Sequence, residues 1–359
     1  MFKKLDLYII KKFLGTFFFI LTLLMIIASI FDVSEKIDDF IESAAPLNAI
    51  LFDYYVNFFI HYGNLFSPLL IFISVIWFTG KMAHQTEIVA ILSGGVSFHR
   101  FLLPYFVSAT ILALLSLYLN HYQLPVANKA RLQFEEDYIR NKFTISDKNL
   151  HREIELGTII YFESFNYQRS FGYHFSMEKW ENGKLTFKLL SDKASTDSTN
   201  HWIIDNYYIR TYDENLKETI RSGRQMDTII PFTPADLGQR NTVASALTTP
   251  ELNDFIKREK LKGSDQVPFY ELEKHQRTSL PFATYILTLI GVSIASRKVR
   301  GGIGLHIALG FTIAIIYIFF MKLSAVAATN SGLDPLIAVW IPNILFLGLG
   351  AYIYQKAPK

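Results

Sequence analysis

Residues 66–95 read FSPLLIFISVIWFTGKMAHQTEIVAILSGG, an apolar run followed by a short amphipathic pattern and a double glycine. The apolar run is typical of a membrane-spanning helix. The amphipathic part spaces its apolar residues along one helical face, and the glycines are typical of a helix end. The stretch therefore predicts a membrane span followed by a separate short helix at about residues 81–95. Its apolar face would comprise Met82, Ile88, Val89 and Leu92.

The rest of the chain repeats this apolar pattern at both ends. Of the 359 residues, 50% are hydrophobic and 19% are charged, and the charged residues concentrate in the middle. Long apolar runs are the signature of membrane-spanning helices, and no cleavage pattern follows the first run. We therefore expect a membrane α-helical protein with six transmembrane helices in a 3+3 arrangement. The expected spans are residues 13–31, 52–79, 98–120, 279–296, 303–328 and 335–354.

Lysine and arginine concentrate on one side of the predicted membrane topology. Short cytoplasmic flanks of inner-membrane proteins carry an excess of these residues. The opposite side would hold an acidic loop at 32–42 and a loop at 329–334 without Lys or Arg. The sequence therefore predicts a multi-pass inner-membrane protein with both termini cytoplasmic. The positive flanks would contain Lys3, Lys4, Lys11, Lys12, Lys81, Arg100, Arg297, Lys298, Arg300, Lys356 and Lys359.

A polar insert separates the third and fourth spans. It contains short, alternating segments rich in β-branched and aromatic residues. In chain order they are GTIIYFESF, FGYHFSMEKW, KLTFKLLSD, HWIIDNYYIR, ETIRSG and MDTIIPF. Asn182–Gly183 lies between two of them and is a strong hairpin signal. We expect an all-β domain, a sandwich or jelly roll, with flanking helices on the outer side. The expected division is 1–120 with the short helix, 121–278 with the β domain, and 279–359.

No pattern indicates catalysis. A P-loop is missing, since Gly80-Lys81-Met82 lacks its remaining residues, and HExxH is absent. There is no cysteine, and the nine histidines show no metal-ligand spacing. We expect no enzyme activity, cofactor or metal in this chain, and the net charge of +3 does not suggest nucleic acid as a partner.

Two glycine-rich strings admit a second interpretation. Gly301, Gly302 and Gly304 beside the positive residues of 297–300 resemble a phosphate loop, but also suit a flexible cytoplasmic turn. Ser93-Gly94-Gly95 resembles part of a hydrolase motif, but a helix C-cap explains it better. Neither string is specific.

The short helix is the better lead to function. Helices that lie on membrane surfaces usually carry a polar face rich in Lys and Arg. This helix has one lysine and an acid, Glu87, which suits a groove on a protein. A membrane protein without an ATPase motif that displays such a helix could receive force from a soluble motor.

Four features together resemble one family. They are LDLYIIKKF at 5–13, the stretch 66–95, the β insert between spans three and four, and ELEKHQRTSLPFATYIL at 271–287. In this combination the whole chain resembles the LptF/LptG family of lipopolysaccharide export permeases, and it is most similar to LptG.

The resemblance implies a function and partners. The chain would be the permease subunit of an ABC transporter that extracts lipopolysaccharide from the inner membrane and passes it to a periplasmic bridge. ATP and Mg²⁺ would be used by an LptB-type ATPase dimer. Further partners would be a second LptF/LptG-type permease and LptC-type and LptA-type bridge proteins, the latter two aligned with a periplasmic jelly roll.

The resemblance also implies residue roles. Glu87 would be the acid of the coupling helix that enters a groove on the ATPase, accompanied by His84, Ile88, Leu92 and Gly94. Asp32 and His61 fall where LptG has lysines, so its phosphate contacts are not transferred to this chain. Because lipopolysaccharide carries phosphates, we consider cations near the outer ends of the spans as substrate contacts. These candidates are Lys36, His61, Lys129, Arg131 and Lys322.

Two other functions compete with this one. A mechanotransmission subunit would move no lipid, but such subunits with large external domains usually have four spans. An envelope scaffold or receptor would bind a periplasmic partner through its β domain, but it would need a cytoplasmic output domain. Co-purification with a separately encoded ATPase would separate the transporter from the receptor.

Overall fold

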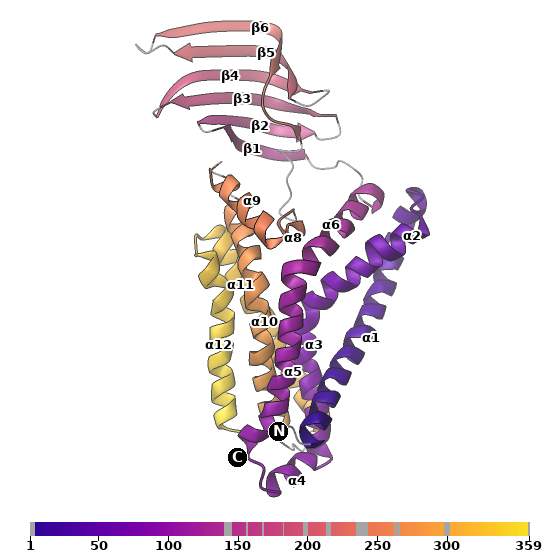
Figure 1. The fold of residues 1–359 in the computed structure, drawn as a ribbon. Coiled ribbons are helices and arrows are strands. Elements are labelled where there is room, and N and C mark those ends of the chain that lie inside the picture. The colour runs from indigo at the N-terminus through magenta and orange to yellow at the C-terminus, as the bar shows by residue number, and fades with distance from the viewer. Residues whose placement is uncertain are drawn as a thin grey trace. The chain divides into compact units, whose positions relative to one another are not determined.

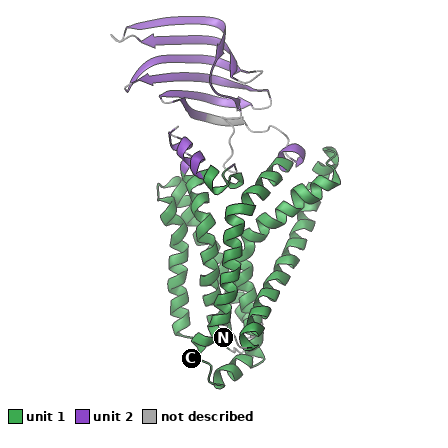
Figure 2. Cartoon of the chain, in the orientation of Figure 1, with its two compact units in different colours: residues 1–134, 244–252, 268–359 green, residues 135–243, 253–267 purple. Residues whose placement is uncertain are grey.

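The computed structural model describes residues 4–139, 146–155, 157–166, 169–181, 183–196, 200–212, 217–234, 243–261, 264, 266–297 and 302–357. The chain divides into two compact units (Figure 2). We call residues 1–134, 244–252 and 268–359 the helical unit, and residues 135–243 and 253–267 the β unit. Several residues singled out above lie outside the described ones: Lys3, Asn182, Lys298, Arg300, Gly301 and Lys359.

Six helical stretches among the described residues are long and apolar enough to cross a membrane, which confirms the predicted 3+3 arrangement (Figure 1). Three of them are single helices of the C-terminal half: α10 (Val267–Ala295), α11 (Gly302–Asn330) and α12 (Pro335–Gln355). The N-terminal three are α1 (Lys4–Glu42); α2 (Leu47–Ala49), η1 (Ile50–Tyr55) and α3 (Val56–His84); and α5 (Phe98–Tyr118), η2 (Leu119–Gln123), α6 (Leu124–Phe134) and η3 (Glu135–Ile139). Three short helices complete the set: α4 (Glu87–Ser93), α8 (Val243–Ala246) and α9 (Thr249–Leu261).

The predicted loop at 32–42 is wrong, because α1 continues through it as far as Glu42. Lys36 donates a hydrogen bond to Asp32, four residues earlier, at 2.8 Å. Such i,i+4 pairs stabilise a helix. Phe40 is buried against Tyr54 and Phe134 at ring-centroid distances of 6.1 and 6.0 Å. Local pairing and packing therefore extend the helix beyond its apolar part.

The spanning helices differ in how much of their surface the unit covers. In the most apolar window of α10, 67% of the residues are buried, against 17% for α1 and 22% for α11. Helix α10 approaches α3 closely at Gly291, where an added Cβ would lie 2.9 Å from Val75 Cγ1. Helices α1 and α11 thus leave most of their apolar surface to lipid or to another protein.

The β unit confirms the predicted all-β insert. Six antiparallel strands form one sheet in chain order. The hairpin at Gly183 is present, with a glycine φ of +75°. The strand β1 has no counterpart among the predicted segments, and the last two predicted segments form the single strand β6. The strands are β1 (Ser146–Glu155), β2 (Thr158–Asn166), β3 (Phe171–Glu181), β4 (Lys184–Ser195), β5 (His201–Tyr212) and β6 (Glu218–Ile229).

The described part of the β unit holds one sheet, where a sandwich or jelly roll would have two. The chain after β6 folds back and covers the apolar face. Phe232 stacks on Trp202 at a ring-centroid distance of 4.3 Å, and Trp202 Nε1 donates a hydrogen bond to its carbonyl oxygen at 3.2 Å. Both side chains are fully buried. This segment supplies the cover that a second sheet would otherwise give.

Candidate functional site

Helix α4 is a separate short helix between two spanning helices, at the end of the helical unit that holds both termini (Figure 1). It begins later than the sequence predicted, because α3 continues to His84 with Met82 packed in the core. The break is made by Thr86, whose φ is +62°. Left-handed backbone is unusual for a β-branched residue and marks a constrained junction. Gly95, with a φ of +83°, turns the chain towards α5.

The predicted coupling residues divide between two faces of α4. Ile88 is buried, with 1% of its surface exposed, and Leu92 packs against the same hydrophobic cluster. Val89, which the prediction of the contact set omitted, is 54% exposed. The exposed residues around α4 are His84, Gln85, Thr86, Val89, Ala90, Ser93, Gly94 and Gly95. A partner would therefore meet a small, mostly neutral face, while Ile88 and Leu92 hold α4 to its own unit.

The carboxylate of Glu87 contacts the first turns of α1. It accepts a hydrogen bond from the Tyr8 hydroxyl at 2.9 Å and lies 3.7 Å from Lys12 Nζ. The Lys12 ammonium also lies 4.3 Å from the centroid of the Tyr8 ring. The three side chains form a compact polar group at the beginning of α4. Sequence reasoning missed Tyr8 and Lys12, because 79 residues separate Tyr8 from Glu87.

A second contact ties α1 to the other side of α4. Arg100 Nη1 and Nη2 donate hydrogen bonds to the two carboxylate oxygens of Asp6, at 2.8 and 2.7 Å. Asp6 is 2% exposed, and paired two-point contacts of this kind are among the stronger hydrogen bonds in proteins. Arg100 lies in the first turn of α5, where Ser97 caps the helix by accepting a hydrogen bond from the Arg100 backbone N–H. Thus α1 contacts the chain on both sides of α4.

Among the predicted substrate contacts, Lys36 is held within its own unit. Its ammonium donates to Asp32 at 2.8 Å, hydrogen-bonds the Tyr54 hydroxyl and lies 4.7 Å from the centroid of the Tyr54 ring. Tyr55 donates to the other Asp32 oxygen at 3.1 Å. Asp32 therefore neutralises Lys36 and joins α1 to the beginning of the second span.

Two further candidates, His61 and Arg131, share one aromatic partner. The His61 ring lies 4.8 Å from the Tyr62 ring, and the Arg131 guanidinium carbon lies 5.8 Å from its centroid. Through Phe58, Tyr62 continues an aromatic row to Tyr54, with centroid distances of 4.4 and 6.0 Å. The structure thus brings Lys36, His61 and Arg131 to one aromatic row along the second span.

His61 also lines a polar cavity of about 100 Å³ between the second, third and fourth spans. Within it, Asn64 Nδ2 donates to Asn120 Oδ1 at 2.9 Å. Arg277, 3% exposed, donates to the Ala244 carbonyl at 2.9 Å. Asn128 donates to the Ser245 carbonyl at 3.0 Å. These bonds anchor the segment at 244–252 to α6 and α10.

Lys129 and Lys322 lie apart from this row. Both side chains are exposed, Lys129 on α6 and Lys322 on α11. Among the described residues, no hydrogen bond, ion pair or ring contact joins either lysine to the aromatic row. Lys322 occupies one of the least covered helices, so it is placed to meet lipid or a second protein.

An apolar pocket of about 170 Å³ opens between α1, α3 and α5. Its wall includes Phe17 and Leu115, with Asn64, Ser67 and Ser116 as its polar members. Its volume and its mostly apolar lining suit part of a hydrocarbon chain. Among the described residues no group of three or more His, Asp or Glu side chains is placed to hold a metal ion.

Comparison of the chain with models of protein families supports this architecture. A comparison of the chain with curated proteins gives no match. The family model described as "Lipopolysaccharide export system permease LptF/LptG" matches residues 7–356. The match includes the six spanning helices almost completely, the β insert and α4. The chain therefore belongs to the LptF/LptG family of lipopolysaccharide export permeases.

Proposed function

We propose that the chain is the permease subunit of an ABC transporter that extracts lipopolysaccharide from the inner membrane. ATP hydrolysis in a separate LptB-type ATPase dimer would drive the extraction. Beyond family membership, the observation that carries this proposal is the exposed face of α4. This short helix is joined to α3 and α5, and α1 contacts it through Tyr8 and contacts α5 through Asp6. A displacement of α4 would reach all three helices.

The orientation that this proposal requires has both termini and α4 in the cytoplasm and the β unit in the periplasm. The excess of Lys and Arg on the flanks at the α4 end supports it. In this proposal the chain is not an enzyme and binds no cofactor, because ATP and Mg²⁺ are held by the partner ATPase. The LptG identity rests on the N-terminal resemblance at 5–13 alone.

The path of the lipid would follow the second span. Acyl chains suit the apolar pocket between α1, α3 and α5, and phosphates suit cations such as Lys36 and Arg131 on the aromatic row. Because Asp32 already neutralises Lys36, a phosphate would have to compete with that carboxylate. A second permease of the same family would pack on α1 and α11, the least covered helices.

The β unit would continue the path towards LptC-type and LptA-type bridge proteins. Among the described residues its sheet runs from β1 to β6 without closing, so the outer backbone groups of these two edge strands have no partner strand. An edge of this kind accepts another strand by main-chain pairing. The lipopolysaccharide would then pass along joined sheets towards the outer membrane.

Two substitutions test the coupling role of α4. Glu87→Ala removes the acid, and Val89→Asp places a charge on the exposed face; we expect both to reduce ATPase co-purification and lipopolysaccharide export. Leu261→Asp, at a residue of α9 that is 73% exposed, is the matched control. Unchanged export in Val89→Asp would remove the exposed face of α4 from the mechanism. Unchanged export in Glu87→Ala would remove only its acid.

Photo-crosslinking tests the lipid path. A photo-reactive residue placed in turn at Lys36, His61 and Lys322 should capture lipopolysaccharide in cells at the first two positions. Failure at all three positions, in a complex that still contains the ATPase, would reject the path and favour a mechanotransmission subunit that moves no lipid.

A further inference from the structure

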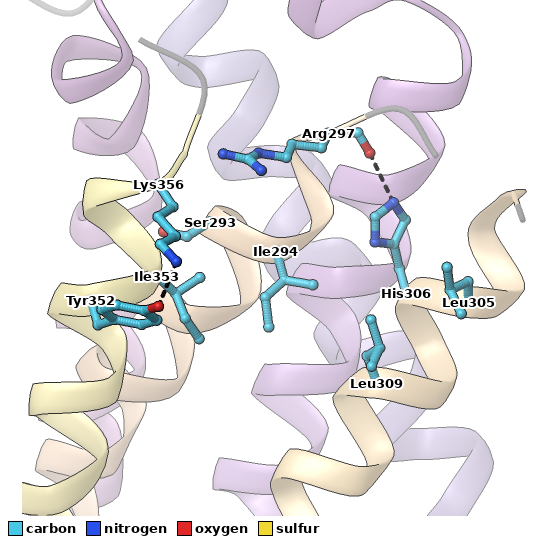
Figure 3. A pocket seen from close by; sticks show the side chains of 9 residues that line it. All are labelled: Ser293, Ile294, Arg297, Leu305, His306, Leu309, Tyr352, Ile353 and Lys356. Carbon is cyan, nitrogen blue, oxygen red and sulfur yellow. Dashed lines mark hydrogen bonds between the residues drawn. The ribbon is translucent and has the colours of Figure 1, made fainter. Parts of the chain in front are cut away.

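A pocket of about 260 Å³ lies at the α4 end of the helical unit, between the end of α10, the beginning of α11 and the end of α12 (Figure 3). Its helices differ from those of the apolar pocket at α1, α3 and α5. The wall is mostly hydrocarbon and includes Ile294, Leu305, Leu309 and Ile353. Leu305 and Leu309, each 46% exposed, are one helical turn apart on α11. The pocket is therefore open to the surroundings along an apolar strip.

Two cations line the same pocket. Arg297 extends its guanidinium over it towards the side of Lys356 (Figure 3). The Lys356 ammonium hydrogen-bonds the Tyr352 hydroxyl and lies 4.4 Å from the centroid of that ring. Within the part of the chain that the structure describes, neither cation forms an ion pair with a carboxylate. Their charge is thus available to an anion from outside the chain.

His306 adds a buried acceptor. Its side chain is 4% exposed, and Nε2 lies 2.9 Å from the Arg297 carbonyl oxygen. Because a carbonyl oxygen only accepts, a neutral ring that makes this bond carries its proton on Nε2, and Nδ1 is an acceptor. Nδ1 is buried, has no partner among the described residues and faces the pocket (Figure 3). A buried acceptor without a partner is costly, so a ligand hydroxyl would be favoured there.

The beginning of α11 also favours an anion in this pocket. The helix starts at Gly302, and the N–H groups of a first turn have no partners within their own helix. The partial positive charge of this end favours an anion nearby. The first described turns of α11 thus contribute Leu305 and His306 to a pocket that Arg297 and Lys356 also line.

We propose that this pocket binds an anionic glycerophospholipid of the surrounding bilayer, with phosphatidylglycerol as its best fit. The phosphate would meet Arg297 and Lys356, and a glycerol hydroxyl would donate to His306 Nδ1. An acyl chain would lie along Leu305 and Leu309. Basic pockets between spanning helices are typical sites for anionic headgroups. Such a lipid would join the ends of α10, α11 and α12, and the proposal does not depend on the path of lipopolysaccharide.

Free phosphate offers the same charge but would leave the apolar strip uncovered. Phosphatidylcholine has a compensating positive charge, and phosphatidylmethanol keeps the negative charge but has no headgroup hydroxyl. These three ligands therefore separate the contributions of charge, acyl chain and hydroxyl. Lys11 and Lys81 serve as the matched control for the loss of two positive charges. Both are exposed at the α4 end of the helical unit, and neither lines the pocket.

The experiment is native mass spectrometry of the detergent-solubilised full chain titrated with dioleoyl lipids. We expect phosphatidylglycerol to bind R297Q/K356Q about tenfold more weakly than the wild type. The control K11Q/K81Q should bind it normally, and phosphatidylcholine should bind weakly to all three. His306→Phe should reduce the affinity for phosphatidylglycerol to that for phosphatidylmethanol.

Three results would overturn the proposal: equal phosphatidylglycerol binding by R297Q/K356Q and K11Q/K81Q, full competition by millimolar inorganic phosphate, or equal binding of phosphatidylcholine. Displacement of the bound lipid by purified lipopolysaccharide in the wild type, lost in R297Q/K356Q, would also overturn it by giving the pocket to the substrate. If the double variant does not elute as a folded protein, the single variant R297Q replaces it in the comparison with K11Q/K81Q. The Arg297 side chain is exposed, so this variant should fold.

Discussion

Arg100 donates two hydrogen bonds to the carboxylate of Asp6, at 2.8 and 2.7 Å, and so fixes the start of α5 to the start of α1. The two residues are 94 positions apart in the chain, and α4 lies between them in sequence. In this multi-pass inner-membrane permease, the contact therefore ties α1 to the helix that follows α4. Substitution of Arg100 tests how much this contact stabilises the start of α1.

Replacing Arg100 with Gln should loosen the start of α1, because the buried Asp6 carboxylate would lose the two hydrogen bonds from the guanidinium. Hydrogen bonds to charged groups are stronger than those between neutral groups, so we expect a measurable loss of protection at the start of α1. The measurement is hydrogen exchange of residues 5–13 in the solubilised chain. Asp6→Asn/Arg100→Gln should recover part of the protection. Strictly additive losses in the double variant would show that the pair does not couple.

Thr86 holds the junction of α3 and α4 in left-handed backbone, with a φ of +62°. Glycine adopts this conformation without steric cost, so Thr86→Gly should leave the melting temperature unchanged or slightly raised. Thr86→Pro should lower it, since proline requires a φ near −65° and loses the hydrogen bond from the Thr86 N–H to the Ala83 carbonyl. Equal melting temperatures for the two variants would contradict this account of the junction.

Gly291 lets α10 approach α3. A Cβ at this position would lie 2.9 Å from Val75 Cγ1 and 3.2 Å from Phe72 Cδ2. Gly291→Ala should therefore lower the stability of the helical unit by about 1–3 kcal/mol through overpacking. Gly348→Ala in α12 is the control, because an added Cβ there meets nothing within 4 Å. Thermal melting in detergent should separate the two; similar curves would show that the helices adjust freely.

A pH effect is expected in the β unit. Lys188 Nζ donates to Glu178 Oε1 at 2.7 Å from the facing position of the neighbouring strand. This hydrogen bond lowers the pKa of the Glu178 carboxyl from its ordinary value of 4.5. Because the pKa is lowered in the folded state, the pair stabilises the sheet above pH 4.5. Its contribution is lost as the pH falls through the lowered folded-state pKa.

Glu178→Gln should accordingly weaken the protection of β3 and β4 amides at neutral pH by about 0.2–1 kcal/mol, the usual size for a half-exposed cross-strand pair. In acid the difference from the wild type should vanish. Hydrogen exchange corrected for intrinsic rates measures both. In Glu178→Gln/Lys188→Gln the pH dependence due to this pair should be absent, and its persistence there would assign the effect to another group.

Several elements were predictable because their cause is local. Each span is an apolar run of the required length, and the hairpin at Gly183 needs a residue that tolerates a positive φ. The short helix after residue 80 was visible in its apolar spacing. By contrast, β1 reads SDKNLHREIE and carries almost no apolar alternation. It is a strand because its backbone groups pair with β2, a cause that lies outside its own residues.

The candidate site shows the same division. The sequence indicated Glu87 as a residue of interest, but not that Tyr8 and Lys12 contact it. Ile88 and Leu92 were assigned to a partner surface because periodicity defines a face without saying what covers it. In the structure their apolar side chains pack into the unit itself, and Val89 takes the exposed position.

By itself, the sequence determined the number of spanning helices, the all-β insert and the short helix after the second span, since each follows from composition and periodicity within a few turns of chain. Only the tertiary structure decided which side of α4 is exposed, that Asp32 neutralises Lys36, and that Arg297, His306 and Lys356 line one pocket. Those relationships depend on how helices pack against one another. Packing joins residues tens of positions apart, which no local pattern records.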